Sequence, residues 1–508
     1  MICNMKKNIV KILAAGAVLF AAASCDMNLV PEGSFVYEPE NIITNENDLN
    51  GFEAGVMAQF RGLFGGVLDE PQDIMVDYFN AVSDYGNNYG GVHRADSDLN
   101  ASNYDTRDNW RYPFLSMKNY NIVINGAKTV PEGLEAKAGI ARGEAFVARA
   151  YAYLHMIRLF AKPYGASAST DLGLPLVLEY DQNARPERAS VQAIYDQIKS
   201  DLDSAAVLLA DVKGEPRAQR PSIDFVNAMF ARYYLDTKQY AQAAAAAHKL
   251  IDSGTYKLSA TAEEMENEFV NDQGSEAILQ FFGNLQEGGY MTHSYYAPMA
   301  KDSEKGLYYR PYYIPTKALL DSYDAGDLRL AQWFSNPSAP VLVNGSFYEN
   351  EISVFKRFAG NPALRTDDVP NTRQFIKPIL ISEMYLIAAE AELVSDAAAA
   401  KTDLNALQAA RGAAQTAATD ETVRKEWYRE TVGLGLRISC LKRWGIGFSD
   451  RAGQTNATAK EIIVRGDNFD GKSLPATDFH FVWPVPTHEI QVNPNLKQND
   501  GYTAVDVE

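Results

Sequence analysis

The distribution of apolar positions along the chain predicts a mainly helical protein. In three stretches apolar residues recur every three or four positions, the spacing of one helix face. These positions are Val147, Ala150, Leu154 and Ile157, then Ile194, Ile198, Leu202 and Ala206, then Leu380, Met384, Ile387 and Ala391. Ser190 precedes the second stretch and is a suitable N-cap, because its hydroxyl can accept a backbone N–H of the first turn.

Two further stretches, 225–251 and 384–407, predict helical hairpins with small residues where the two helices would cross. The positions are Phe230, Ala231, Tyr234, Ala243, Ala247 and Leu250 in the first stretch, and Ala388, Ala400, Leu404 and Leu407 in the second. This spacing resembles a tetratricopeptide unit, although an unrelated Ala-rich hairpin matches it too. With the helices of 141–210, these hairpins predict a mainly α, tetratricopeptide-like scaffold, interrupted by long irregular loops and a few short strands.

Residues 64–113 and 284–375 lack a sustained period and are rich in Gly, Asn, Asp, Pro and Tyr. Loops this long are uncommon inside a helical protein unless they have a function. We therefore expect the functional site in these two segments.

The first 24 residues predict a secretory signal. Lys6, Lys7 and Lys11 form a positive start, and an apolar run from Ile12 to Ala23 leads through a small residue into Cys25. The run would span only about 18 Å as a helix, too short for a hydrocarbon core of about 30 Å. The segment resembles a bacterial lipoprotein box, so we expect Cys25 to be lipidated and residues 25–50 to form a tether and a docked segment. The alternative is a plain secreted protein in which Cys25 is incidental.

The negative charge of the chain limits the classes of partner that it can bind. The net charge is −18, and removal of three lysines with residues 1–24 makes it more negative. This balance argues against binding to nucleic acid and against electrostatic adhesion to anionic lipid, so membrane attachment would depend on acyl chains. With Cys25 acylated, only Cys440 would remain as a free thiol, and we expect it to be a small buried apolar residue.

The C-terminal segment 481–502 carries the most specific motifs. They are Pro484, Pro486, Glu489 and Ile490, followed by Asn493, Pro494, Leu496, Gln498, Asn499, Gly501 and Tyr502. Further motifs upstream are Trp110, Phe114, Met117 and Asn121; Arg149, Tyr151, Tyr153, Leu154, Tyr164, Gly165, Leu174 and Pro175; Asp327 and Arg329; Glu383, Tyr385, Leu386, Ala389 and Glu390; and Glu426, Glu430, Gly435, Arg437, Leu441, Arg443 and Trp444. This ordered set resembles the SusD/RagB family of nutrient-binding outer-membrane lipoproteins.

Four positions depart from the family pattern, and each departure removes a charge. Trp427 and Leu380 stand where an Arg is usual, Leu434 where a Glu is usual, and Cys440 where an Asp is usual. We therefore expect internal ion pairs to be rearranged. The motif residues Arg149, Glu383, Glu430 and Arg437 are expected to be interior ion-pair partners rather than catalysts, because an unpaired buried charge is very unfavourable. Trp110 is expected in the core.

The resemblance implies a binding protein without enzymatic activity, held by lipid on the outer face of the outer membrane. It would capture an oligomeric nutrient, a glycan or alternatively a peptide, and deliver it to a SusC-like TonB-dependent transporter that it covers as a lid. It also implies a SusD-like N-terminal region at 51–220 and a tetratricopeptide-like and RagB/SusD C-terminal region at 221–508.

Two clusters of aromatic and amide side chains could bind such a ligand. The segment 84–94 alternates tyrosines with Asn and Gly, and the segment 290–313 holds seven tyrosines. Flat rings with polar groups around them suit both sugar and peptide recognition. The predicted ligand-binding residues are Tyr85, Asn88, Tyr89, Tyr295, Tyr296 and Tyr309. The alternative is that the tyrosines fasten a long loop to the scaffold.

No motif in the sequence requires catalysis, a cofactor or a metal. The six histidines are scattered without ligand spacing, and no pair of the many carboxylates is singled out for glycoside hydrolysis. A surface glycan hydrolase and a protein-binding adaptor remain as less favoured alternatives.

Overall fold

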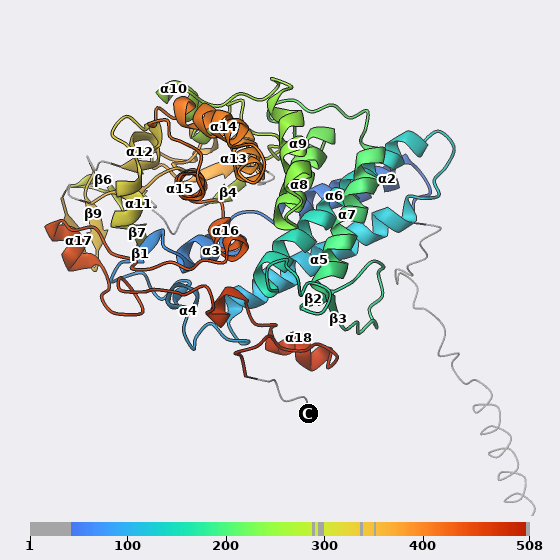
Figure 1. Ribbon diagram of the computed structural model, residues 1–508, viewed down its shortest axis with the longest axis horizontal. Helices are drawn as coiled ribbons and strands as arrows, with labels where there is room; N and C mark the ends of the chain where they lie inside the picture. The colour runs from blue at the N-terminus through green and yellow to red at the C-terminus, as the bar shows by residue number, and fades with distance from the viewer. Residues whose placement is uncertain (1–41, 287–289, 293–298, 336–338, 350–351, 504–508) are drawn as a thin grey trace, which may run out of the picture. The chain divides into compact units, whose positions relative to one another are not determined.

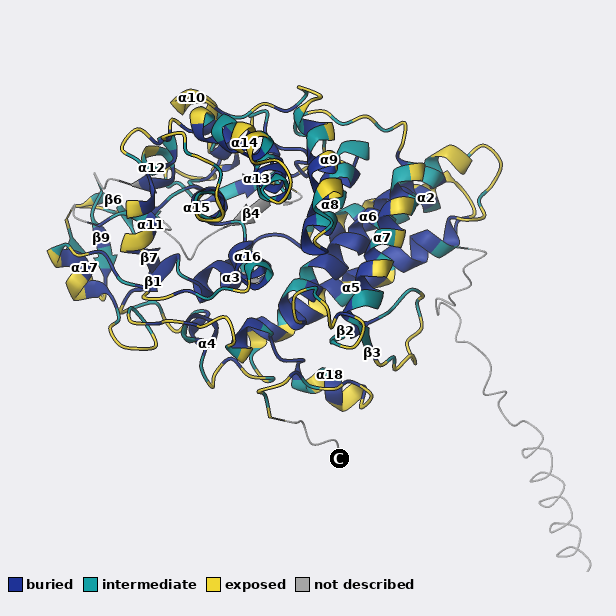
Figure 2. Cartoon of the chain, in the orientation of Figure 1, coloured by how far each residue is buried: buried dark blue, intermediate teal, exposed yellow. Residues whose placement is uncertain are grey.

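Helix α6 (Glu135–Phe160) follows the apolar stripe that the sequence predicts. Val147, Ala150, Leu154 and Ile157 are all buried, and Figure 2 shows the helix buried along most of its length. The computed structural model describes residues 42–286, 290–292, 299–335, 339–349 and 352–503. Helices dominate these residues, with a few short strands among them, so the predicted fold class is confirmed (Figure 1).

Helix α7 (Val191–Leu208) begins where its N-cap predicts. The Ser190 hydroxyl accepts the N–H of Ala193 at 3.1 Å. Ile194, Ile198 and Leu202 are buried as expected, but Ala206 is half-buried and Ala205 takes the interior position. The reason is that steps of four residues overshoot the helical period of 3.6, so the buried stripe moves back by one residue.

The helical hairpins pack side by side as an interrupted repeat. Each helix packs on the next in the order α5 (Tyr104–Gly126), α6, α7, α8 (Ile223–Asp236) and α9 (Tyr240–Ile251). Helix α9 then packs on α13 (Ile381–Glu392), which packs on α14 (Ala397–Ala410). The predicted hairpins are α8–α9 and α13–α14, and their crossing alanines, including Ala243, Ala247 and Ala388, have no exposed surface. The prediction of an interrupted solenoid is confirmed.

The remaining helices, most of them shorter, lie outside this stack. They are α2 (Glu46–Arg61), α3 (Glu70–Met75), α4 (Gly90–Arg94), α10 (Ala262–Phe269), α11 (Lys317–Ser322), α12 (Leu328–Trp333), α15 (Asp420–Glu430), α16 (Arg437–Trp444), α17 (Ala457–Ile462) and α18 (Thr487–Val492), with 3-10 turns η2 (Gly66–Leu68), η3 (Pro362–Leu364) and η4 (Phe479–Phe481). Several lie in the segments expected to be irregular, because elements of six residues or fewer are too short to show a period.

The strands form small sheets, mostly in the second segment expected to be irregular. They are β1 (Phe79–Ala81), β2 (Leu172–Pro175), β3 (Arg188–Ser190), β4 (Tyr290–Thr292), β5 (Met299–Asp302), β6 (Gly306–Tyr309), β7 (Tyr313–Pro315), β8 (Phe334–Ser335), β9 (Val341–Val343), β10 (Ser346–Tyr348), β11 (Val354–Phe355) and β12 (Arg373–Phe375). One sheet has four strands in the order β10-β9-β6-β5, and the others are pairs: β1-β7, β11-β8, β12-β4 and β2-β3. Only the β6–β9 pairing among these is parallel.

The charged motif residues form buried pairs, as predicted. Arg149 binds Asp201 through two nitrogens at 2.8 and 2.6 Å, and joins α6 to α7. The other pairs are Glu383 with Arg232, Glu430 with Arg329 and Arg411, and Arg437 with Asp77. Trp110 and Cys440 are buried, which confirms the expected core positions.

None of the helices in the described ranges is long and apolar enough to span a bilayer. Helices α7 and α8 flank residue 220 and pack against each other, and residues 43–508 form one compact unit. The proposed division at residue 220 stays a prediction about sequence regions.

Candidate functional site

The two aromatic segments predicted to bind ligand meet next to strand β1. This strand pairs antiparallel with β7, so that Ala81 lies opposite Tyr313. On its other side, the Ser83 N–H bonds the Ile462 carbonyl at 2.8 Å, and the Val464 N–H bonds the Ala81 carbonyl at 3.0 Å. Strand β7 and residues 462–464, both far from β1 in the chain, therefore fix the start of the 84–94 loop.

The ring of Tyr85 lies on this base. It packs edge-on against Tyr313 with 5.9 Å between ring centroids, and against Phe469 with 6.2 Å. Tyr313 is fully buried and its hydroxyl donates to the backbone carbonyl of Asn88. Tyr85 and Phe469 are half-buried, so part of each ring faces solvent.

Arg94 gathers the polar groups around this ring. Its Nη1 donates to the Tyr85 hydroxyl at 3.1 Å and to Asn87 Oδ1 at 3.0 Å. Its Nε donates to Asp96 at 2.8 Å, and its Nη2 pairs with Asp98. The rigid guanidinium fork thus fixes the ring, an amide and two carboxylates in one arrangement. We call Tyr85, Asn87, Asn88, Arg94 and Phe469 the Tyr85 surface.

The backbone of this loop is strained. Asn87, Tyr89 and Ala95 have φ values of 57°, 53° and 42°, in the left-handed region that side chains other than Gly rarely adopt. Such conformations cost about 1–3 kcal/mol each and cluster at functional sites. Three of them within nine residues mark the 84–95 segment as a candidate site.

A buried layer of His93 and Arg451 supports the surface from below. Both side chains are fully buried, and Arg451 Nη1 donates to the His93 carbonyl at 2.8 Å. Burial and the Arg451 charge hold the pKa of His93 well below its usual value, so the imidazole is neutral. Its ring contacts Tyr313 at 5.1 Å between centroids. Neither residue faces solvent, so their role is to position the loop.

The predicted ligand residues that the structure describes lie in three different environments. Tyr85 and Asn88 belong to the Tyr85 surface, and the Asn88 amide donates to the Tyr85 carbonyl at 2.8 Å. Tyr89 is only 3% exposed and its hydroxyl donates to Glu70, so it supports the loop from inside. Tyr309 is half-buried against the apolar cluster that includes Val82. Tyr295, Tyr296 and the lipidation residue Cys25 lie outside the described residues.

A hairpin next to the loop was missed by the sequence reasoning. Asn344 and Gly345 form the two-residue turn between β9 and β10, both with positive φ. An Asn-Gly pair between apolar runs is a strong hairpin signal, and it was present in the sequence. The turn contacts the loop directly, because the Asn344 amide donates to Ser83 Oγ at 2.6 Å and its N–H to Asp84 at 3.0 Å.

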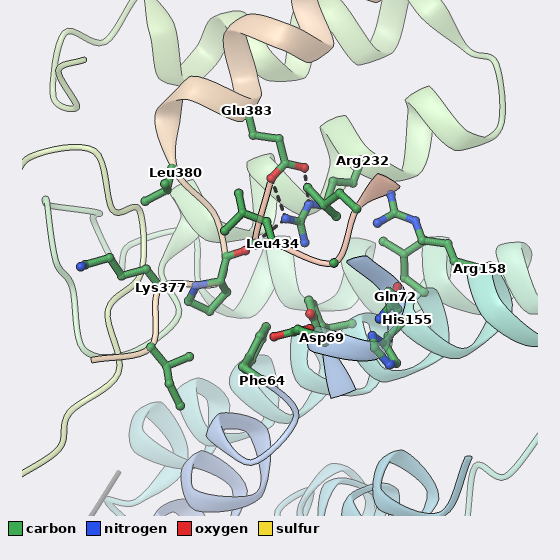
Figure 3. Close-up of a pocket in the computed structure, with 17 residues that line it drawn as sticks. Phe64, Asp69, Gln72, His155, Arg158, Arg232, Lys377, Leu380, Glu383 and Leu434 are labelled. Atoms are coloured by element: carbon green, nitrogen blue, oxygen red, sulfur yellow. Dashed lines mark hydrogen bonds and ion pairs between the residues drawn. The ribbon is translucent and has the colours of Figure 1, made fainter. Parts of the chain in front are cut away.

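A central cavity of about 50 Å³ lies elsewhere, between α6, α8 and α13 (Figure 3). It is lined by the Arg232–Glu383 pair, His155 and Arg158 among others. Burial lowers the pKa of His155 to about 4, and its Nε2 lies 3.2 Å from Asn109 Oδ1. A water needs roughly 10–15 Å³. The cavity therefore suits a few waters, and it is too small for a sugar.

The four residues that depart from the family pattern form two pairs, one at this cavity and one next to it. Leu380 and Leu434, which replace an Arg and a Glu, both line the central cavity (Figure 3). Trp427 and Cys440, which replace an Arg and an Asp, both line a small neighbouring cavity, where Arg443 lies over the Trp427 ring. Each loss of a cation is thus accompanied by the loss of an anion. Replacement of a buried ion pair by apolar residues is often neutral or stabilising.

A larger cavity of about 600 Å³ lies beside the C-terminal segment. Phe479, 40% exposed, lines it together with Asp171, Asp478 and Lys442. Burial lowers the pKa of Lys442 to about 7, although its Nζ donates to the Ala161 carbonyl at 2.7 Å. Ligand pockets commonly measure roughly 300–1,000 Å³, so this cavity is a second candidate position for a ligand.

Comparison with known proteins agrees with this fold. A family model described as starch-binding associating with outer membrane matches residues 69–235, and the SusD family model matches residues 365–502. The two models together match more than half of the chain. The chain belongs to the SusD/RagB family.

Solved structures match almost the whole chain at low identity. A SusD superfamily protein from Bacteroides thetaiotaomicron is 23% identical, with a TM-score of 0.69 over 89% of this chain and 99% of that one. A laminarin-binding SusD-like protein is 22% identical, with a TM-score of 0.68 over 90% and 100%. Surface glycan-binding protein A from Bacteroides fluxus is 17% identical, with a TM-score of 0.68 over 90% and 100%. These likenesses show the fold. No curated protein matches the chain.

Proposed function

We propose that this chain is a carbohydrate-binding lipoprotein of the cell surface that captures oligosaccharides at the Tyr85 surface. The contact between Tyr85 and Tyr313 carries the proposal, because it brings the two predicted aromatic segments together. A half-buried ring with a fixed guanidinium and amides around it offers a sugar a stacking face and hydrogen-bond partners.

The family and two of its structural neighbours support carbohydrate as the ligand class. One matching family model is described as starch-binding, and two neighbours are named for laminarin and for surface glycan. The half-buried Tyr309 next to Val82 extends the aromatic region toward the four-stranded sheet. A peptide ligand is compatible with the same groups and is the alternative that the binding test below decides.

The location and partner follow from the N-terminal sequence and the family resemblance. The signal at residues 1–24 and Cys25 support a lipid anchor in the outer membrane, with the folded part facing the cell exterior. The captured oligosaccharide would pass to a SusC-like TonB-dependent transporter. Copurification with a large outer-membrane partner from detergent extracts tests this step, and recovery of the chain alone would contradict it.

The role is binding without catalysis. A glycoside hydrolase needs two carboxyl groups free to act on the glycosidic bond. At the Tyr85 surface, both Asp96 and Asp98 pair with Arg94, which supports a fixed binding surface instead. Release of reducing ends from laminarin by the purified chain, abolished by one carboxylate substitution, would overturn this part of the proposal.

Isothermal titration of the full chain with laminarin oligosaccharides tests the site. Tyr85→Ala should weaken binding at least tenfold, whereas Tyr234→Ala, a half-buried tyrosine on α8, should leave it unchanged. Loss of binding in Phe479→Ala but not in Tyr85→Ala would move the site to the 600 Å³ cavity. Binding of peptides and of no glycan in the same assay would contradict the carbohydrate assignment.

A further inference from the structure

Three acid–base side chains meet where the two helical hairpins join. His248 comes from α9, Glu392 is the last residue of α13, and Asp403 comes from α14. One ligand atom from each lies within 4.8 Å of the others. His248 Nε2 is 2.9 Å from Glu392 Oε1 and 3.2 Å from Asp403 Oδ2.

Two carboxylate oxygens in this cluster accept no hydrogen bond from the described residues. Asp403 is 5% exposed, and its Oδ2 accepts no hydrogen bond from the described residues although it points at His248. Glu392 Oε2 is likewise buried without a hydrogen-bond donor among those residues. A single imidazole N–H can serve only one acceptor well, so the buried Asp403 and the half-buried Glu392 facing one imidazole leave a charge to be neutralised.

We propose that His248, Glu392 and Asp403 bind a divalent transition-metal ion, with Zn²⁺ as the best match. One imidazole nitrogen and two carboxylate oxygens suit Zn²⁺ better than Ca²⁺ or Mg²⁺, which prefer oxygen ligands throughout. Tetrahedral Zn²⁺ with bonds of about 2.1 Å places its ligand atoms roughly 3.4 Å apart. The two separations from His248 Nε2, 2.9 and 3.2 Å, would widen by about 0.5 and 0.2 Å to reach this value.

The second nitrogen of His248 is arranged for this role. Its Nδ1 lies 3.5 Å from the carboxylate of Asp252, one helical turn further along the chain. A carboxylate that holds the Nδ1 proton leaves the Nε2 lone pair free for a metal, as is usual for metal-binding histidines. The His248 side chain is 30% exposed, which gives the ion a route from solvent and leaves a coordination position for water.

The ion would connect parts of the chain that the long insertion separates. Helix α9 precedes residues 252–380 and helices α13 and α14 follow them. The metal would therefore cross-link the two hairpins of the interrupted repeat. This role does not depend on carbohydrate binding at the Tyr85 surface.

Titration of EDTA-treated full chain with Zn²⁺ tests the site by calorimetry and by thermal unfolding. We expect one ion per chain, a rise in Tm of several degrees with Zn²⁺, and no rise with Mg²⁺ or Ca²⁺ at the same concentration. His248→Ala and Asp403→Asn should each weaken binding at least tenfold. His488→Ala, which removes a histidine paired with a single carboxylate, should bind as the unaltered chain does.

Absorption of the Co²⁺-loaded chain adds a readout of geometry, with bands of a tetrahedral ion expected in the unaltered chain and absent from Asp403→Asn. The near-isosteric Asp403→Asn decides the test if His248→Ala does not fold. Absence of Zn²⁺ binding, or binding that both variants retain, would overturn the site. It would then be an imidazolium held between two carboxylates.

Discussion

The ring of Tyr85 packs edge-on against the buried ring of Tyr313, with 5.9 Å between their centroids. This contact ties the 84–94 loop to the end of the tyrosine-rich segment 290–313. The Tyr85 ring itself is half-buried and lies beside the guanidinium of Arg94. The loop and Phe469, whose ring packs edge-on against Tyr85 at 6.2 Å, thus form one surface above the buried Tyr313 ring.

Substitution of Arg94 by Lys should weaken oligosaccharide binding about tenfold and shift Tm by no more than about 2 °C. Lys cannot form the four contacts of the guanidinium fork, so the Tyr85 ring and the Asn87 amide lose their fixed arrangement. The effect on stability should be small, because partly exposed ion pairs contribute roughly 0–1 kcal/mol. Calorimetry and thermal unfolding measure both effects. Arg424→Lys, on α15, is the matched control, and full affinity in Arg94→Lys would contradict the role of the fork.

Leu380 and Leu434 at the central cavity should behave as apolar replacements of an ion pair. Leu380→Arg places a charge at a buried position and should destabilise the protein by about 3 kcal/mol or more, whereas Leu434→Glu, at a half-buried position, should destabilise it less. The double variant should recover at least about 1 kcal/mol of the summed loss, because the two charges can then pair. Urea unfolding of all four proteins gives the coupling energy. Strictly additive losses would show that the two positions do not interact.

Loss of the Arg149 guanidinium should destabilise the helical scaffold strongly. Arg149→Ala leaves the Asp201 carboxylate buried without its two charged hydrogen bonds, which typically costs about 3–5 kcal/mol. Replacement of both residues by apolar side chains should restore part of the loss, since no buried charge then remains. Denaturant unfolding measures the difference. A loss below about 1 kcal/mol for Arg149→Ala would argue against a buried ion pair between α6 and α7.

Asp73 should make the protein less stable as the pH rises from about 4 to 8. Burial raises the pKa of this fully buried carboxyl to about 8, from near 4 when unfolded. Between these values the folded state holds a proton that the unfolded state has lost, so the free energy of unfolding falls by up to about 1.4 kcal/mol per pH unit. The amide introduced by Asp73→Asn does not titrate, so this variant does not lose stability through this group as the pH rises. The stability of the variant relative to the parent should therefore increase toward pH 8, and a difference that stays constant from pH 4 to 8 would contradict it.

The sequence predicted the scaffold well because long helices repeat their signal over several turns. The stripe of residues 147–157 and the alanines of the hairpins recur often enough to be recognised, and burial in the structure follows them closely. Only the details differ, such as Ala205 in place of Ala206. The buried charged residues were also predictable, because a charged side chain within an apolar helix face needs a partner.

The candidate site was only partly predictable. Tyr85 and Asn88 were identified from composition, but the structure alone shows that Tyr89 points inward to Glu70 and that Phe469 joins the surface. These differences arise because the loop direction depends on left-handed backbone at Asn87 and Tyr89, and on pairing between β1 and β7. Neither the left-handed backbone nor the strand pairing produces a periodic pattern in the sequence.

The most direct measurement is a crystal structure of the chain with a bound laminarin oligosaccharide. The proposal predicts a sugar ring against the exposed part of Tyr85, with hydrogen bonds from Arg94 or the neighbouring asparagine amides. An oligosaccharide seated beside Phe479, or on any surface that does not include the 84–94 loop, would contradict it.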